Sequence, residues 1–183
     1  MQETKLSPFV HARMDILLVP LNPPKISISN GHYFSRVSTF WDILYDSKLL
    51  TKRVPDFRIA DELVFGGNKV NYGNANYGIQ DLVSIVQTYS RNVRTRGSDV
   101  DKLLQVVENC PTKIVCLMHN KVIKAFEKAR VMSKAGSGQQ YGLRGRIRDT
   151  LIFAVPFPTG SNLTKEVITE HYSRVWRELD GIL

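Results

Sequence analysis

Three short runs of apolar residues predict buried strands. They span residues 15–20, 113–118 and 150–155. Each run is about six residues long and lacks a polar face, which is typical of a strand covered on both sides. A further apolar segment at 79–86 follows a turn-rich loop. We therefore expect a sheet of about four strands.

Apolar residues at helical spacing separate these strands. The stripes comprise Val37, Phe40, Trp41 and Leu44; Val100, Leu103, Leu104 and Val107; Val122, Ile123 and Phe126; and Ile168, Tyr172, Val175 and Leu179. Strands that alternate with helices form βαβ units, whose helices cover both faces of a parallel sheet. The pattern predicts an α/β fold with three αβα layers and a mostly parallel central sheet. At 183 residues the chain is long enough to bury one sizeable core and shows no internal repeat, so we expect residues 1–183 to form a single domain.

The segments between these elements are polar or turn-rich. Residues 25–35 and 66–78 are predicted to be loops. Residues 133–148 combine Gly, Ser and Gln with four cations, which predicts a mobile basic loop. These cations are Lys134, Arg144, Arg146 and Arg148.

Two proline-containing segments come directly after predicted strands. Residues 20–24 read Pro-Leu-Asn-Pro-Pro, and residues 156–162 read Pro-Phe-Pro-Thr-Gly-Ser-Asn. Consecutive prolines remove backbone donors and exclude helix, so Asn22 lies in a rigid loop. Ligands of parallel sheets bind beyond the carboxyl ends of the strands. We expect both loops to meet at one cleft.

The charge of the chain favours a polyanionic partner. It carries 25 Lys and Arg against 17 Asp and Glu, for a net charge of +8. Cations that neutralise phosphates release counterions, which favours binding to nucleic acid. The alternative is a generally basic, solvated surface. The candidate phosphate contacts are Arg91, Arg94, Arg96, Arg144, Arg146 and Arg148.

Several other classes of protein are excluded. Cys110 and Cys116 are too few for a four-thiolate zinc site, and the four histidines lack metal-ligand spacing. We expect no metal and no cofactor, and we find no carboxylate pair arranged for acid–base work. No stretch approaches the roughly 18 apolar residues of a membrane span, and the first residues lack the apolar core of a signal peptide, so we expect neither feature. We expect an intracellular monomer, in cytoplasm, nucleoid or nucleus, without a membrane partner.

Five segments, taken in order, resemble the uracil-DNA glycosylase superfamily, specifically its mismatch-directed uracil/thymine branch. They are Leu21-Asn22-Pro23-Pro24; Gly31-His32-Tyr33-Phe34 with Phe40-Trp41; residues 77–83; Val115-Cys116-Leu117 with Ala125-Phe126; and residues 156–162. The chain departs from the family pattern at four positions. Prolines 20 and 24 replace glycines, Thr39 replaces an asparagine, and His119 stands where glycine is common.

The resemblance implies a role for each segment. Asn22 is the expected catalytic residue, and Phe34 is the ring on which an extruded base stacks, with Tyr33 as its near neighbour. The expected substrate contacts are Leu21, Pro23, Pro24, Tyr33, Phe34, Phe157 and Thr159. The expected DNA contacts are Gly160, Ser161, Asn162, Arg94, Arg96 and Arg146.

The chemistry of base removal fits an asparagine. Cutting an N-glycosidic bond places positive charge on the sugar and negative charge on the base. The Asn22 side-chain carbonyl can orient a water, but it cannot take the proton as a carboxylate would. This predicts a slow enzyme that favours uracil-like, deaminated or alkylated bases. The alternative is that Asn22 only hydrogen-bonds the loop backbone.

The leading hypothesis is a monofunctional DNA glycosylase that flips a uracil or related base out of double-stranded or single-stranded DNA. A second hypothesis is a non-catalytic DNA- or nucleotide-binding domain that keeps the fold. A third is an enzyme acting on a small nucleoside or nucleotide, for which binding would depend little on salt.

Overall fold

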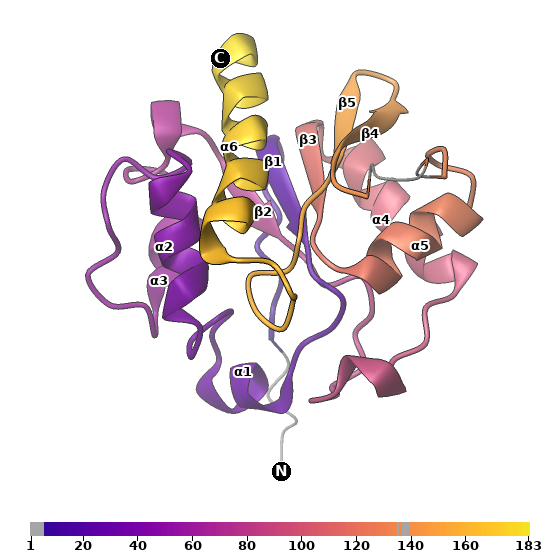
Figure 1. Cartoon of the computed structure of the whole chain (residues 1–183), viewed down its shortest axis with the longest axis horizontal. Helices are drawn as coiled ribbons and strands as arrows, with labels where there is room; N and C mark the ends of the chain where they lie inside the picture. Colours follow the sequence, from indigo (N-terminus) through magenta and orange to yellow (C-terminus); the bar gives the residue numbers. More distant parts are fainter. Residues whose placement is uncertain (1–5, 135, 137–139) are drawn as a thin grey trace.

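The computed structural model describes residues 6–134, 136 and 140–183, and its centre is one five-stranded sheet (Figure 1). The strand order is β2-β1-β3-β5-β4. The first four strands in that order are parallel, and β4 is antiparallel to β5. The strands are β1 (Met14–Val19), β2 (Tyr77–Ile79), β3 (Thr112–Leu117), β4 (Gly142–Ile147) and β5 (Thr150–Ala154).

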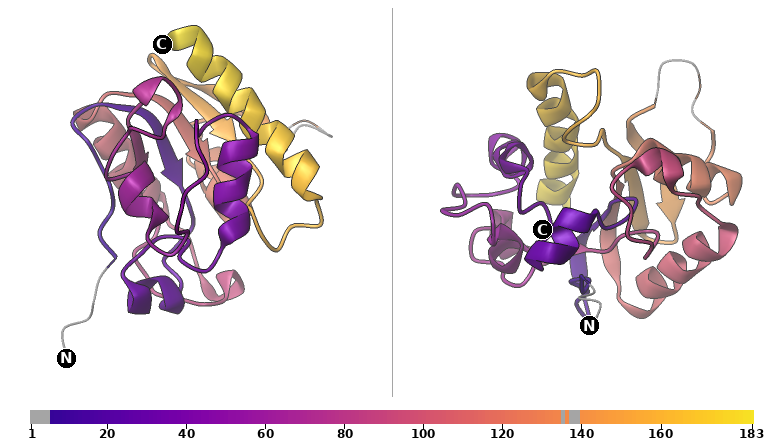
Figure 2. Two further views of the ribbon diagram at one scale, coloured as in Figure 1. Left: turned by 90° about the vertical axis from the view of Figure 1, so that its left-hand side faces the viewer. Right: turned by 90° about the horizontal axis from the view of Figure 1, so that it is seen from below.

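Helices cover both faces of the sheet, which confirms the predicted αβα layers (Figures 1 and 2). One face carries α2 (Ser38–Asp46), α3 (Ala60–Val64) and α6 (Lys165–Ile182). The other carries α4 (Gly97–Asn109) and α5 (Asn120–Lys128). A short helix, α1 (Lys25–Asn30), lies below the end of the sheet, and single 3₁₀ turns form at η1 (Tyr72–Asn74) and η2 (Ser90–Asn92).

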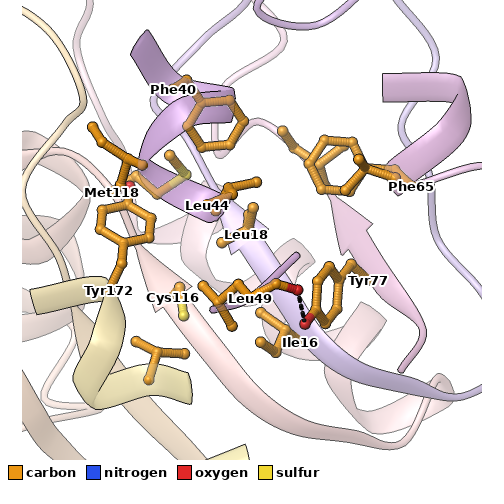
Figure 3. Packing of buried hydrophobic residues seen from close by; sticks show 14 of the residues in the cluster. Ile16, Leu18, Phe40, Leu44, Leu49, Phe65, Tyr77, Cys116, Met118 and Tyr172 are labelled. Atoms are coloured by element: carbon orange, nitrogen blue, oxygen red, sulfur yellow. Dashed lines mark hydrogen bonds between the residues drawn. The ribbon is translucent and has the colours of Figure 1, made fainter. Parts of the chain in front are cut away.

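The side chains of β1 alternate between two apolar cores because successive residues of a strand face opposite sides of the sheet. Ile16 and Leu18 join the core under α2, α3 and α6. Leu17 and Val19 join the core under α4 and α5. Figure 3 shows the first core, where the buried Tyr77 hydroxyl donates to the Leu49 carbonyl at 2.8 Å. A continuous apolar run is therefore the expected sequence of a central strand.

The structure corrects three details of the sequence prediction. The sheet has five strands rather than about four, because residues 142–147 form β4 within the predicted basic loop 133–148. Part of that loop, residues 135 and 137–139, lies outside the described residues. The predicted loop 25–35 begins with α1, and the apolar segment 79–86 leaves β2 after Ile79.

Two further findings concern the whole described chain. Across residues 6–134, 136 and 140–183, no helix is long and apolar enough to cross a membrane. Within the same residues, no group of three or more His, Cys, Asp or Glu side chains is arranged to hold a metal ion.

Candidate active site

A cavity of about 450 Å³ lies beyond the carboxyl ends of the four parallel strands. It falls within the range of roughly 300–1,000 Å³ that is usual for ligand pockets. The two proline-containing loops meet there, as expected from the sequence. Its walls include Pro20, Leu21, Asn22, Pro24, Ile26, Ser27, Tyr33, Phe34, Arg36, Asp81, Gln87, Thr88, Ser90, His119, Asn120, Tyr141, Phe157, Thr159, Gly160 and Ser161.

The Asn22 amide is fixed by backbone carbonyls. Its Nδ2 donates to Gln87 O at 2.8 Å, to Pro23 O at 3.2 Å and to Ile85 O at 3.3 Å. An amide nitrogen carries only two protons, so three carbonyls more than satisfy it. These contacts hold the side chain in one orientation. Within the described residues, Oδ1 accepts no hydrogen bond from the protein and stays free to accept one from a ligand or water.

Phe34 presents an aromatic ring to the cavity from a strained backbone. Its φ is +52°, a conformation that bulky residues adopt rarely and that is typical of functional sites. Phe40 stacks behind it, with ring centroids 3.9 Å apart and an interplanar angle of 30°. Phe157 lies 6.0 Å away at 39°. The ring therefore has little freedom to move.

Asp61 holds the loop that carries Phe34. This fully buried carboxylate accepts the Tyr33 backbone N–H at 2.7 Å and lies 3.0 Å from His32 Nδ1. It also accepts the Glu62 N–H at 3.0 Å. Hydrogen bonds to a charged acceptor are the strong ones, so this residue stabilises the left-handed turn at Phe34. His32 faces Asp61 and does not line the cavity.

Asp81 places a carboxyl group in the cavity wall. The chain after β2 continues beside β1, with Gln80 N donating to Leu18 O at 3.0 Å and Leu82 N donating to Pro20 O at 2.9 Å. Asp81 therefore lies next to the first proline loop. Burial raises the pKa of Asp81 to about 7, while a hydrogen bond from the Tyr33 hydroxyl opposes the rise. The pKa of that hydroxyl is raised, chiefly by burial.

His119 follows β3 and begins α5. Its Nδ1 accepts the Lys121 backbone N–H at 3.0 Å, so the neutral ring carries its proton on Nε2. Burial and the nearby Lys121 charge lower the pKa of His119, which favours this neutral form. The ring packs edge-on against Phe157 at 6.1 Å. The cavity wall thus includes a neutral hydrogen-bond donor at the end of β3.

Lys121 does not serve as a free cation. Its Nζ donates to Ser90 O at 2.6 Å, to Val93 O at 2.8 Å and to Arg91 O at 3.1 Å. Three carbonyls satisfy the three protons of the ammonium group. This contact joins the start of α5 to the segment around η2.

The second proline loop brings Phe157, Thr159, Gly160 and Ser161 to the cavity. Gly160 has φ +71°, which lets the chain turn there without strain. The Ser161 hydroxyl is buried and has no hydrogen-bond partner among the described residues. Thr164 caps α6 by accepting the Val167 N–H at 3.4 Å.

Most of the residues expected from the sequence come together here. Leu21, Asn22, Pro24, Tyr33, Phe34, Phe157, Thr159, Gly160 and Ser161 all line the cavity. Pro23 does not line it, but its carbonyl accepts the Asn22 amide and the Gln87 N–H. Asn162 is exposed next to Ser161.

The three expected arginine contacts are placed differently. Arg94 and Arg96 are exposed on the segment before α4, which follows the cavity-lining Ser90. Arg146 is exposed on β4 opposite Leu151, at the start of β5. Since the cavity lies beyond the end of β5, the structure does not bring Arg146 to it.

The sequence interpretation gave no site role to Asp81 or Gln87, and it treated His119 only as a departure from the family pattern. A signal was present for two of them. Asp81 and His119 each follow a parallel strand, as Asn22 and Phe157 do. The rule that ligands bind at the carboxyl ends of strands applies to all four strands.

The fold and site define an α/β protein with a ligand cavity at the carboxyl edge of a parallel sheet, lined by a fixed amide, a supported aromatic ring and a few polar groups. Residues 7–180 match the model of the Uracil DNA glycosylase superfamily, and the chain belongs to this family. Proteins of this superfamily are in general uracil DNA glycosylases that act on DNA. This match confirms the superfamily resemblance noted in the sequence. No curated protein matches the chain.

Proposed function

We propose that this protein is a monofunctional DNA glycosylase that hydrolyses the N-glycosidic bond of uracil or a related damaged or mismatched base. We place it in the mismatch-directed uracil/thymine branch and infer one domain over residues 1–183, acting as a monomer without metal or cofactor. The observation that carries the proposal is the Asn22 amide. Its nitrogen is held by three carbonyls, and its oxygen accepts no hydrogen bond from the part of the chain that the structure describes.

In the proposed reaction, Asn22 Oδ1 accepts a hydrogen bond from a water placed below the anomeric carbon. The bond between that carbon and the base nitrogen breaks, and its electron pair leaves with the base. The water oxygen then bonds to the carbon, and the proton it loses ends on the base. Since the amide cannot accept a proton, the rate depends on positioning and on a base that leaves readily.

The other groups of the cavity hold the base. An extruded base stacks on Phe34, which Phe40 supports from behind. The His119 Nε2–H donates to an oxygen of the departing base, where negative charge develops. Tyr33 and Asp81 complete the wall on the side of β2.

The rim of the cavity contacts the DNA in this proposal. Gly160, Ser161 and Asn162 approach the strand, and Arg94 and Arg96 contact phosphates. Such contacts position the protein but carry no sequence information. A contact by Arg146 stays a prediction, and it requires DNA that extends to the β4 side of the molecule.

The test is cleavage of a panel of duplexes by the purified protein. Each duplex carries one uracil, mismatched thymine, hypoxanthine or ethenocytosine, and abasic product is revealed by alkali. We expect cleavage of uracil opposite guanine by the wild type. Asn22→Ala should lose cleavage by about 100-fold or more while keeping most DNA affinity. Asn109→Ala, at the exposed end of α4, is the matched control and should cleave normally.

One observation favours the non-catalytic alternative. The same three carbonyl contacts would suit an asparagine that only stabilises its loop. That alternative predicts no abasic product from any duplex at stoichiometric protein. The absence of abasic product from every duplex would overturn the glycosylase proposal. If the wild type does cleave, equal losses of DNA binding and cleavage in Asn22→Ala would instead count against the water-positioning role of Asn22.

A further inference from the structure

Three large apolar side chains are exposed within five residues at the mouth of the cavity. Ile85 is 53% exposed, Val86 39% and Tyr89 61%. Gln87 and Thr88, which lie between them, line the cavity. Single exposed apolar side chains are ordinary, but a cluster beside a ligand cavity marks an interaction surface. We call Ile85, Val86 and Tyr89 the apolar rim.

The backbone of the apolar rim is fixed at both ends. The Asn22 amide donates to the carbonyls of Ile85 and Gln87, and Gln87 N donates to Pro23 O at 3.3 Å. At the other end, Lys121 holds three carbonyls of residues 90–93. These hydrogen bonds hold the segment that carries the apolar rim in one conformation. Figure 1 shows this segment at the lower end of the sheet, together with α1.

The positive charge of this segment indicates a nucleic-acid partner. Residues 82–98 contain no Asp or Glu but contain Arg91, Arg94 and Arg96. The Arg91 guanidinium lies 5.1 Å from the centroid of the Tyr89 ring. Aromatic and apolar side chains flanked by arginines are the surface on which nucleic-acid bases stack, while the cations contact the backbone.

We propose that the apolar rim stacks against the bases that flank the extruded nucleotide and fills the gap left in the DNA. The inference rests on the proposed function and names a surface that it does not use. Ser161, on the other proline loop, offers only a small buried hydroxyl for this purpose. Because the carbonyls of Ile85 and Gln87, in the segment that carries the rim, bind the Asn22 amide, DNA bound on the rim also holds Asn22 in place.

The test uses a duplex with a tetrahydrofuran abasic analogue, which needs no cleavage, and a neighbouring 2-aminopurine. We expect Ile85→Ser/Tyr89→Ser to bind this duplex about tenfold more weakly than the wild type and to reduce the rise in 2-aminopurine fluorescence. Affinity for the intact duplex should change less. Phe57→Ser/Ile59→Ser is the matched control, because these side chains are 39% and 49% exposed outside the cavity.

The salt dependence separates stacking from charge. The slope of log Kd against log salt should stay the same in the rim variant and should fall by about one in Arg94→Gln. Unchanged binding by the rim variant, or an equal loss in the control, overturns the inference. So does a wild-type dimer in sedimentation that the rim variant abolishes, because a second copy would then cover the rim. If the wild type cleaves no lesion but the rim variant shows the expected binding losses, the glycosylase proposal is refuted and the inference about the rim stands.

Discussion

Asp81→Asn is expected to stabilise the folded protein at pH 8 and to change its stability little at pH 4. The folded state raises the pKa of this carboxyl from 3.8 to about 7, chiefly by burial. Between these values the folded protein holds a proton that the unfolded chain has released. The free energy of unfolding therefore falls as pH rises from about 4 to 7. Asparagine has nearly the same shape and no charge to bury.

The size of the effect follows from the shift. Each pKa unit corresponds to about 1.4 kcal/mol, so a rise of about three units costs about 4 kcal/mol at pH 8. This is an upper bound, because Asp81 is partly exposed through the cavity and water there screens its charge. We expect a gain of about 2–4 kcal/mol. For a protein of this size, that raises Tm by roughly 4–16 °C.

Urea denaturation followed by circular dichroism at pH 4, 6 and 8 measures the difference. The gain in free energy of unfolding should grow with pH, with no change in the denaturant slope. Asp101→Asn, on the exposed side of α4, is the control and should show no such trend. A gain that is equal at all three pH values, or a loss at pH 8, would show that the Asp81 carboxyl is well solvated and refute the reasoning.

Four further substitutions, at three positions, test the parts of the site. Phe34→Ala removes the ring stacked on Phe40 and should lower the free energy of unfolding by about 3 kcal/mol and weaken capture of an extruded base, as read from single-turnover rates at rising protein concentration. Asp61→Ala should cost about 3 kcal/mol in urea denaturation, since it leaves the buried Tyr33 N–H unpaired. His119→Asn keeps an acceptor for the start of α5, so Tm should stay within about 2 °C while cleavage of uracil falls about tenfold or more. His119→Ala should lose the cap as well, by about 1 kcal/mol in the unfolding free energy. Unchanged cleavage in His119→Asn would remove that ring from the reaction.

The sequence predicted the layers and three of the strands because apolar patterning is a strong signal. It missed β4 because Gly142 and Gly145 both have positive φ, at +113° and +158°, and interrupt the pattern of this edge strand. It missed α1 because six residues after two prolines carry too little periodicity. Such short elements form only where the rest of the fold supports them.

The candidate site was predicted where a loop has unusual composition and missed where one ordinary residue ends a strand. Prolines mark the loops of Asn22 and Phe157. Apart from its position after β2, nothing in the sequence marks Asp81, whose raised pKa comes from the atoms packed around it. The contacts of Asn22 with Ile85 and Gln87 join residues more than sixty positions apart, and no local pattern predicts them.

The carbonyl oxygens around Asn22 also limit how this protein can gain speed. A carboxylate at position 22 would be a stronger base, yet it would face the oxygens of Pro23, Ile85 and Gln87 with no proton to offer. It would have to take up a proton, and so cease to be a base, or swing away from the cavity. A faster variant therefore needs the segment at residues 85–87 rebuilt together with position 22, and neither change is useful alone.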